Sequence, residues 1–171
     1  MEVKHKLSEN TGSIMVESAL VCLIGLMLLA VCIESACCYL TISMIRNKTD
    51  SAVLSVAAAN VANIYDGVRE SAGNAREISA GDWSEYVATD DVRSALADML
   101  SLTESGENHM DRITSENGTA YIISGLKTSY VNNEGDDLNF MTTLTVTIPL
   151  HFLNINLNQN LEVKTTYEAR F

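Results

Sequence analysis

The sequence predicts an α+β protein in which one long N-terminal helix is followed by a small head. Three observations predict it: an apolar run over residues 14–33, a stretch over residues 34–65 without proline or glycine, and alternating apolar and polar residues after Gly118. A run of about twenty apolar residues is typical of a membrane-spanning helix, whereas a period of two is typical of strands. We therefore expect a membrane helix that leads into a head containing a helix and an antiparallel sheet.

The apolar run follows a short polar leader. About twenty helical residues rise roughly 30 Å, the thickness of the hydrocarbon core of a bilayer. Glu17 is the only charged residue between Ile14 and Ile33, and a carboxylate at that position in a membrane segment is costly enough to indicate a function. The alternative is structural, because a carboxylate in the first turn of any helix offsets the helix dipole.

The helix is expected to continue beyond the membrane. No strong helix breaker occurs after Glu34 until Asp66-Gly67, and glycine suits the left-handed conformation that ends many helices. Apolar residues recur there at steps of three and four and form one stripe: Leu54, Ala57, Val61, Ile64 and Val68. We expect a helix over residues 13–66, membrane-spanning over about 14–33 and amphipathic where it projects.

The head is expected over residues 67–171. Residues 83–102 are helical in pattern, with Thr89 or Asp90 as the start signal, and residues 105–118 form a polar connection. Alternation predicts strands around Tyr121 and Ile123, at 127–131 as a second strand or a continuation, at 143–152, and at 161–168. Pro149 cannot donate a ladder hydrogen bond, so its strand is at a sheet edge or ends nearby.

Composition excludes several functions. The net charge of −11 lies in the chain after residue 12, because Lys4 and Lys6 balance two glutamates before it, and an acidic body repels nucleic acid. The basic leader favours a cytoplasmic N-terminus. We find no catalytic triad order, phosphate-binding glycine loop or metal-ligand pair, and therefore expect no enzyme and no cofactor. Asp136 and Asp137 could bind calcium, although a solvated turn is the simpler interpretation.

The four cysteines lie within the apolar run or at its far edge, at Cys22, Cys32, Cys37 and Cys38. The remainder of the chain has none, which excludes a head held together by disulfides. We expect these residues to behave as small apolar side chains of the helix. Palmitoylation of Cys37 or Cys38 near the membrane edge remains an alternative.

The start of the apolar run resembles the processing signal of type IV pilins and pseudopilins. Gly12 is followed by Ser13, and Glu17 is then the fifth residue after the glycine. In that family a prepilin peptidase cleaves after the glycine, and the glutamate guides assembly of the filament. The resemblance implies that residues 1–12 are a cleaved leader, that Gly12 and Ser13 form the processing site, and that Glu17 acts in assembly.

Both ends of the chain are similar to TadE-like minor pseudopilins of tight-adherence (Tad) pili. Their start, Gly-x-x-x-Val-Glu-x-Ala-Leu, is matched by Gly12 and residues 16–20, with Ser18 where an aromatic residue is frequent. A late strand-proline-strand unit ending in an arginine-containing strand is matched by residues 143–170. The resemblance implies a minor subunit of a bacterial pilus with roles in pilus assembly or adhesion.

The expected partners follow from the same resemblance. They are other pilin subunits along the N-terminal helix, the prepilin peptidase, the assembly machinery of the inner membrane and the membrane itself, with no nucleic acid. The protein would cross the cytoplasmic membrane once with its head outside and then pass into a pilus at the cell surface. The alternative is an uncleaved single-pass membrane protein whose outer domain binds a ligand or partner.

Overall fold

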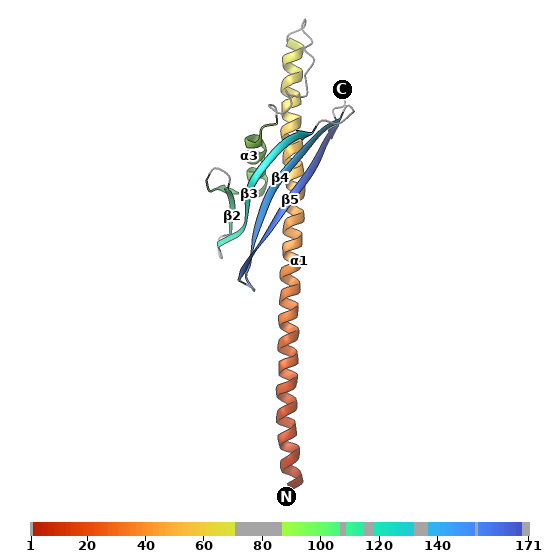
Figure 1. The fold of residues 1–171 in the computed structure, drawn as a ribbon, viewed down its shortest axis with the longest axis vertical. Coiled ribbons are helices and arrows are strands. Elements are labelled where there is room, and N and C mark those ends of the chain that lie inside the picture. The colour runs from red at the N-terminus through yellow and green to blue at the C-terminus, as the bar shows by residue number, and fades with distance from the viewer. Residues whose placement is uncertain are drawn as a thin grey trace. The chain divides into compact units, whose positions relative to one another are not determined.

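The computed structural model describes residues 2–70, 87–106, 109–114, 118–131, 137–152 and 154–168, with the backbone alone at 2–13, 61–70, 113–114, 118, 137 and 168. It confirms the α+β class. The elements are α1 (Glu2–Glu70), α3 (Thr89–Leu100), β1 (Thr103–Glu104), β2 (His109–Thr114), β3 (Gly118–Val131), β4 (Asp137–Leu150) and β5 (Ile155–Glu168). They form two compact units, Met1–Leu40 and Thr41–Phe171, and α1 contributes to both (Figure 1).

Helix α1 is longer than the sequence suggested. It begins at Glu2, before Gly12, and it continues through Gly67 to Glu70. A single glycine in a helix costs only about 1 kcal/mol relative to alanine, so Gly67 does not end the helix without a second breaker beside it. The boundary between the two units lies at Thr41 instead of Gly67, because residues of α1 from Ile45 onward belong to the core of the head.

The five strands form one sheet in the order β1-β2-β3-β4-β5, and all neighbouring strands are antiparallel. Strand β2 falls in the region, residues 105–118, that the sequence predicted as a polar connection, and β1 lies immediately before that region. This prediction was wrong because β2 places few apolar side chains inward: Met110 is buried, whereas His109 is exposed. Pairing with β3 therefore determines this strand more than its own alternation does.

Residues 127–131 continue strand β3. The register between β3 and β4 shifts between Ser124 and Lys127, where Gly125 has a φ of 65°. A residue with positive φ at a register shift is typical of a β-bulge, which bends a strand without ending it.

Pro149 lies in β4, which is an inner strand. Pro149 pairs with Asn156 of β5 beyond the last β3 pair, which is at Thr147, and β4 ends one residue later. Of the two interpretations of Pro149, the nearby strand end is the correct one.

The core of the second unit lies between one face of the sheet and the two helices. Alternate residues of β4 and β5 point into it, among them Phe140, Thr142 and Val163. Five α1 residues are fully buried: Ile45, Thr49, Ala52, Val53 and Ala57. Of the apolar stripe predicted for this helix, Ala57 is buried and Leu54 is half-buried. The side chains of its other members, Val61, Ile64 and Val68, lie outside the described residues.

Helix α3 covers the β3 side of the sheet. The sequence predicts one apolar face of Val92, Leu96, Met99 and Leu100; three of these residues are buried, and Met99 is 37% exposed. The helix begins at Thr89, but its N-cap is Ala88, which makes no capping hydrogen bond through its side chain. The Thr89 hydroxyl instead accepts a hydrogen bond from the Thr128 N–H at 3.2 Å. Thr89 therefore connects the helix to β3, and the predicted helical residues 83–86 lie outside the described residues.

Candidate membrane and assembly segment

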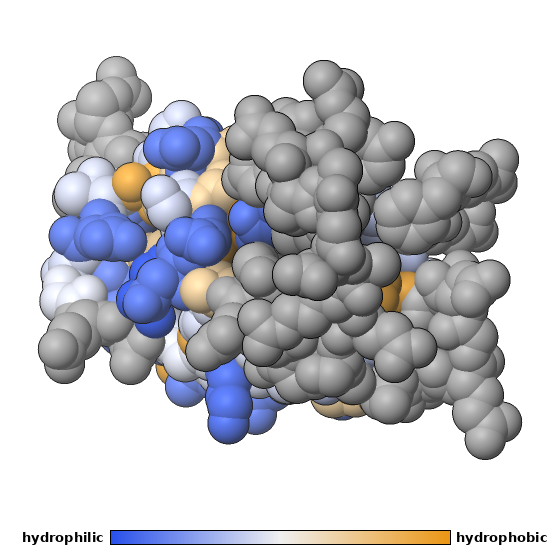
Figure 2. Space-filling view, turned by 90° about the horizontal axis from the view of Figure 1, so that it is seen from above, coloured by the Kyte–Doolittle hydropathy of each residue, from blue (hydrophilic) through white to orange (hydrophobic). Residues whose placement is uncertain are grey.

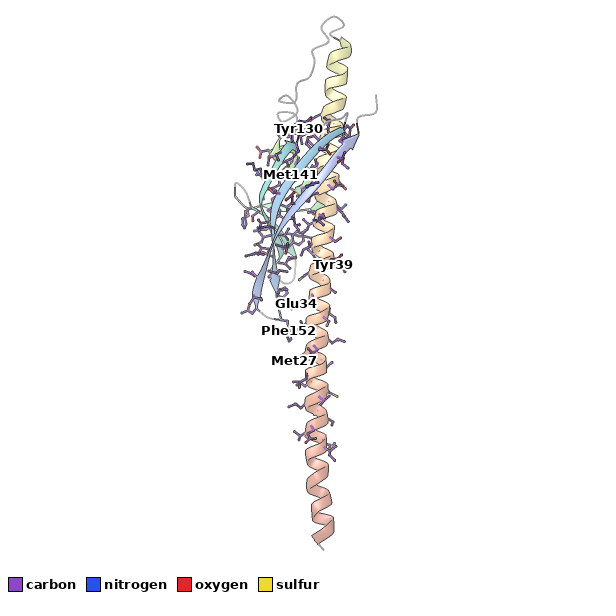
Figure 3. All side chains as sticks on the ribbon, turned by 45° about the vertical axis from the view of Figure 1, so that its right-hand side comes forward. Met27, Glu34, Tyr39, Tyr130, Met141 and Phe152 are labelled. Carbon is purple, nitrogen blue, oxygen red and sulfur yellow. The ribbon has the colours of Figure 1, made fainter. Side chains whose placement is uncertain are left out.

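The N-terminal part of α1 exposes apolar side chains around its whole circumference. One stretch of the described chain, beginning at Ile14, is long and apolar enough to cross a membrane, and its most apolar window has no buried residue. Figure 3 shows Met27 and Tyr39 projecting away from the helix axis. The large apolar side chains between 14 and 33 are 48–74% exposed: Ile14, Met15, Val16, Leu20, Val21, Leu23, Ile24, Leu26, Met27, Leu28, Leu29 and Ile33.

Exposure of these side chains to water is energetically unfavourable. Burial of one large apolar side chain is worth about 1.5–3 kcal/mol, and twelve such side chains are exposed here. The gain from covering them is therefore on the order of 20 kcal/mol, well above the net stability of a typical domain. A helix that is apolar on all sides is covered either by lipid or by other helices. The segment is consistent with a membrane anchor on this ground.

The hydroxyl groups near this segment are satisfied within the helix. Ser18 donates to the backbone carbonyl of Met15 at 3.0 Å, and Ser35 donates to the carbonyl of Val31 at 2.8 Å. In hydrocarbon a polar group without a hydrogen bond costs several kcal/mol, so these bonds lower the cost of placing serine there. Transfer of these serines into hydrocarbon therefore costs little free energy. Transfer of the Glu17 carboxylate costs the most in this segment.

Glu17 lies on the exposed surface of α1, one helical turn after Ser13. Residues four apart share one face of a helix, so the carboxylate and the Ser13 backbone lie on the same side. The backbone at Gly12 and Ser13 is helical, and the structure describes these two residues by their backbone alone. The three predicted site residues are thus brought together by one continuous helix.

The cysteines are free, as Cys22, Cys32 and Cys37 are exposed on α1 and Cys38 is buried. The possible calcium ligand Asp136 lies outside the described residues, and Asp137 is described by its backbone alone as the first residue of β4. Among the residues whose positions are described, no cluster of three or more His, Cys, Asp or Glu side chains could hold a metal ion.

The outer face of the sheet carries a row of hydrogen-bonded threonines and asparagines that the sequence analysis missed. Thr145 donates to the Asn160 side chain at 2.9 Å, and Thr147 donates to that of Asn158 at 2.8 Å. The pair Thr166 and Asn139 repeats the arrangement at 2.6 Å. The signal was present in the alternation of asparagines at 154, 156, 158 and 160, which lie between the strands predicted at 143–152 and 161–168. These pairs stabilise the β4–β5 hairpin across its strands.

The remaining charged groups of the head form no catalytic arrangement in the described part of the chain. His109 and His151 are both exposed and lie in different strands or turns. A shallow groove between α1 and β5 contains Arg46, whose guanidinium lies 3.5 Å from the Glu162 carbonyl oxygen, and Lys164, which lies 3.9 Å from the Glu162 carboxylate. Figure 2 shows a mostly hydrophilic surface where described residues are visible.

No family model matches this chain, no curated protein matches it, and no solved structure matches it.

Proposed function

We propose that this protein is a minor pilin or pseudopilin, a structural subunit of a type IV (Tad-like) pilus. The supporting observation is the division of α1 into two parts with different surfaces. Up to Ile33 its apolar side chains are exposed on all sides, whereas from Ile45 onward one face is fully buried in the head. A single helix with both properties can be anchored in a membrane, or packed among other helices, while it carries a folded head.

The proposed assembly step exchanges lipid for neighbouring helices. Lipid chains and apolar side chains are nearly equivalent surroundings, so this exchange supplies little driving force or register by itself. Glu17 can supply the register. Cleavage after Gly12 would give Ser13 a free amine, and the amine of one subunit beside the carboxylate of another reduces the desolvation cost of both. The pair therefore selects one axial position among many that are equally apolar.

The experiment replaces Glu17 by glutamine, which keeps the shape and removes the charge. We expect Glu17→Gln to insert into membranes and to be cleaved, but to be depleted from the sheared-pilus fraction relative to the wild type. Glu34→Gln is the matched control, because it makes the same change on the same helix beyond the apolar run. Equal amounts of wild type and Glu17→Gln in the sheared fraction would contradict the role of Glu17.

One observation favours the alternative, an uncleaved single-pass membrane protein with a binding domain outside. The backbone at Gly12 and Ser13 is helical, and a peptidase that takes an extended segment would first have to unwind it. Intact-mass measurement of membrane-purified protein separates the two functions. A mature chain beginning at Ser13 supports the pilin, and a chain beginning at Met1 in cells that contain the peptidase supports the alternative.

A further inference from the structure

Strand β5 is the last strand of the sheet and has a neighbour on one side only. It pairs with β4 along all 14 of its residues, without a register shift and without proline or glycine. Among the described residues, no further strand lies beyond it. A long and regular edge strand of this kind presents backbone groups that can pair with another chain.

The backbone groups of β5 that face away from β4 can be identified. Pro149 has no N–H, so its pair with Asn156 is of the type in which the two residues exchange no hydrogen bonds. Pairs of the two types alternate along an antiparallel ladder, so the even-numbered residues of β5 direct their N–H and C=O groups to the free edge. The Glu162 carbonyl confirms this assignment, because it accepts a hydrogen bond from the Arg46 guanidinium at 3.5 Å, outside the ladder.

A groove of about 390 Å³ lies along the middle of this edge. Two exposed side chains cover carbonyl groups there: Arg46 donates to Glu162, and Gln159 donates to Asn160 at 3.2 Å. Both distances lie at or above the upper end of the usual range for N–H···O bonds, about 3.2 Å, so an incoming strand can displace these side chains. The groove belongs to the second compact unit and is lined by six residues: Arg46, Asn47, Asp50, Glu162, Val163 and Lys164.

The charges beside the groove determine which strand fits the edge. Glu162 and Lys164 are exposed on the same face of β5, and they are the only Asp, Glu, Lys or Arg residues from Leu138 to Tyr167. An added antiparallel strand would place side chains directly opposite both of them. A basic residue opposite Glu162 and an acidic residue opposite Lys164 attract, whereas the reverse order repels. The fitting strand therefore has the order acidic-x-basic from its N-terminus to its C-terminus.

We propose that the free edge of β5 binds an extended acidic-x-basic segment of a partner protein, which adds to the sheet as an antiparallel strand. Main-chain hydrogen bonds to the even-numbered residues of β5 give the affinity, and the two charge pairs fix the register. An intact second copy is a poorer occupant, because most of the net charge of −11 lies after residue 40 and two acidic heads repel each other. The inference does not depend on cleavage or membrane insertion, because every residue that carries it belongs to the second unit.

The first test uses the full-length chain in a mild detergent and a fluorescent peptide that copies residues 158–168. This peptide contains Glu-Val-Lys and so has the required order. We expect saturable binding by fluorescence anisotropy, and about tenfold weaker binding of a control peptide in which only the glutamate and the lysine are exchanged. The chain variant that combines Glu162→Lys with Lys164→Glu should reverse this preference. Absence of binding, or equal affinity of both peptides for both chains, would overturn the inference.

The second test blocks the edge itself. The Lys164 N–H faces away from β4, so Lys164→Pro removes no ladder bond but leaves an added strand without its partner. Lys164→Thr, which keeps the N–H, is the matched control. We expect Lys164→Pro to bind the peptide about tenfold more weakly than Lys164→Thr, with equal near-ultraviolet circular dichroism of the two variants. Equal binding would mean that the peptide displaces β5 instead of extending the sheet, which contradicts the inference.

Hydrogen exchange of the wild-type chain provides a measurement that needs no variant. The amides of Glu162 and Lys164 should exchange faster than those of Leu161 and Val163, and the peptide should slow the first two only. Unchanged exchange at Glu162 and Lys164 with the peptide bound would place it elsewhere. Self-association of the chain without peptide, lost in Lys164→Pro, would assign the edge to a second copy; either result overturns the proposal.

Discussion

Packing of α1 against the sheet can be tested by one deletion in its buried face. Ile45 has no exposed surface, and Ile45→Ala removes three carbon atoms from a position enclosed by the sheet and helix. Such a substitution costs about 2–5 kcal/mol, from lost burial and from the cavity that remains. The complete burial of Ile45 and its place one turn before the fully buried Thr49 favour a cost of about 3 kcal/mol.

The matched control is Ile155→Ala, which deletes the same atoms at a position that is 54% exposed. Its expected cost is below about 1 kcal/mol, because little burial is lost and no cavity forms. Both full-length variants are unfolded with urea in a mild detergent, and near-ultraviolet circular dichroism of the tyrosines reports on the head. If the two variants lose equal stability, α1 does not form part of the core and the domain boundary at Thr41 is wrong.

Three further predictions concern single positions. Thr165→Val should destabilise the head by about 1.5 kcal/mol, because the buried hydroxyl donates to the Asp50 carboxylate. In the background of Asp50→Ala the same change should cost less stability. Equal costs in the two backgrounds, measured by urea titration, would contradict the coupling between the two residues. Gly125→Ala should cost about 1 kcal/mol of stability, because its φ of 65° disfavours a side chain even though no atom lies within 4 Å of the added carbon. Gly125→Asn should recover part of that loss in thermal unfolding. An alanine variant as stable as the wild type would contradict the bulge. Gly12→Val should leave the leader attached in cells that contain the peptidase, since the branched side chain no longer fits a site that admits glycine, and a mature mass beginning at Ser13 would refute this.

Several features of the fold were predictable because they depend on local pattern. The apolar segment, the face of α3 and the alternation of β4 and β5 each follow from the spacing of apolar residues along one element. Strand β2 was missed for the opposite reason, since its position depends on the ladder with β3 and its composition is polar. The threonine–asparagine row was missed because it becomes evident only when two strands are placed in register.

The candidate site divides in the same way. Gly12 and Ser13 were identified from the resemblance to the pilin processing signal, and Glu17 also from its place in the apolar run; the structure adds that one helix carries all three. The exposure of Phe152 and Ile155 was not identifiable from sequence, because these residues continue the same alternation as core residues such as Leu161.

The sequence by itself determined the α+β class, the apolar segment and the position of its carboxylate, because hydrophobic length and period are properties of consecutive residues. The tertiary structure alone decided that Ile45, Thr49 and Val53 belong to the core of the head, and that the head begins at Thr41. These features depend on contacts such as that between Asp50 and Thr165, which are 115 residues apart, and no local pattern encodes a contact at that separation.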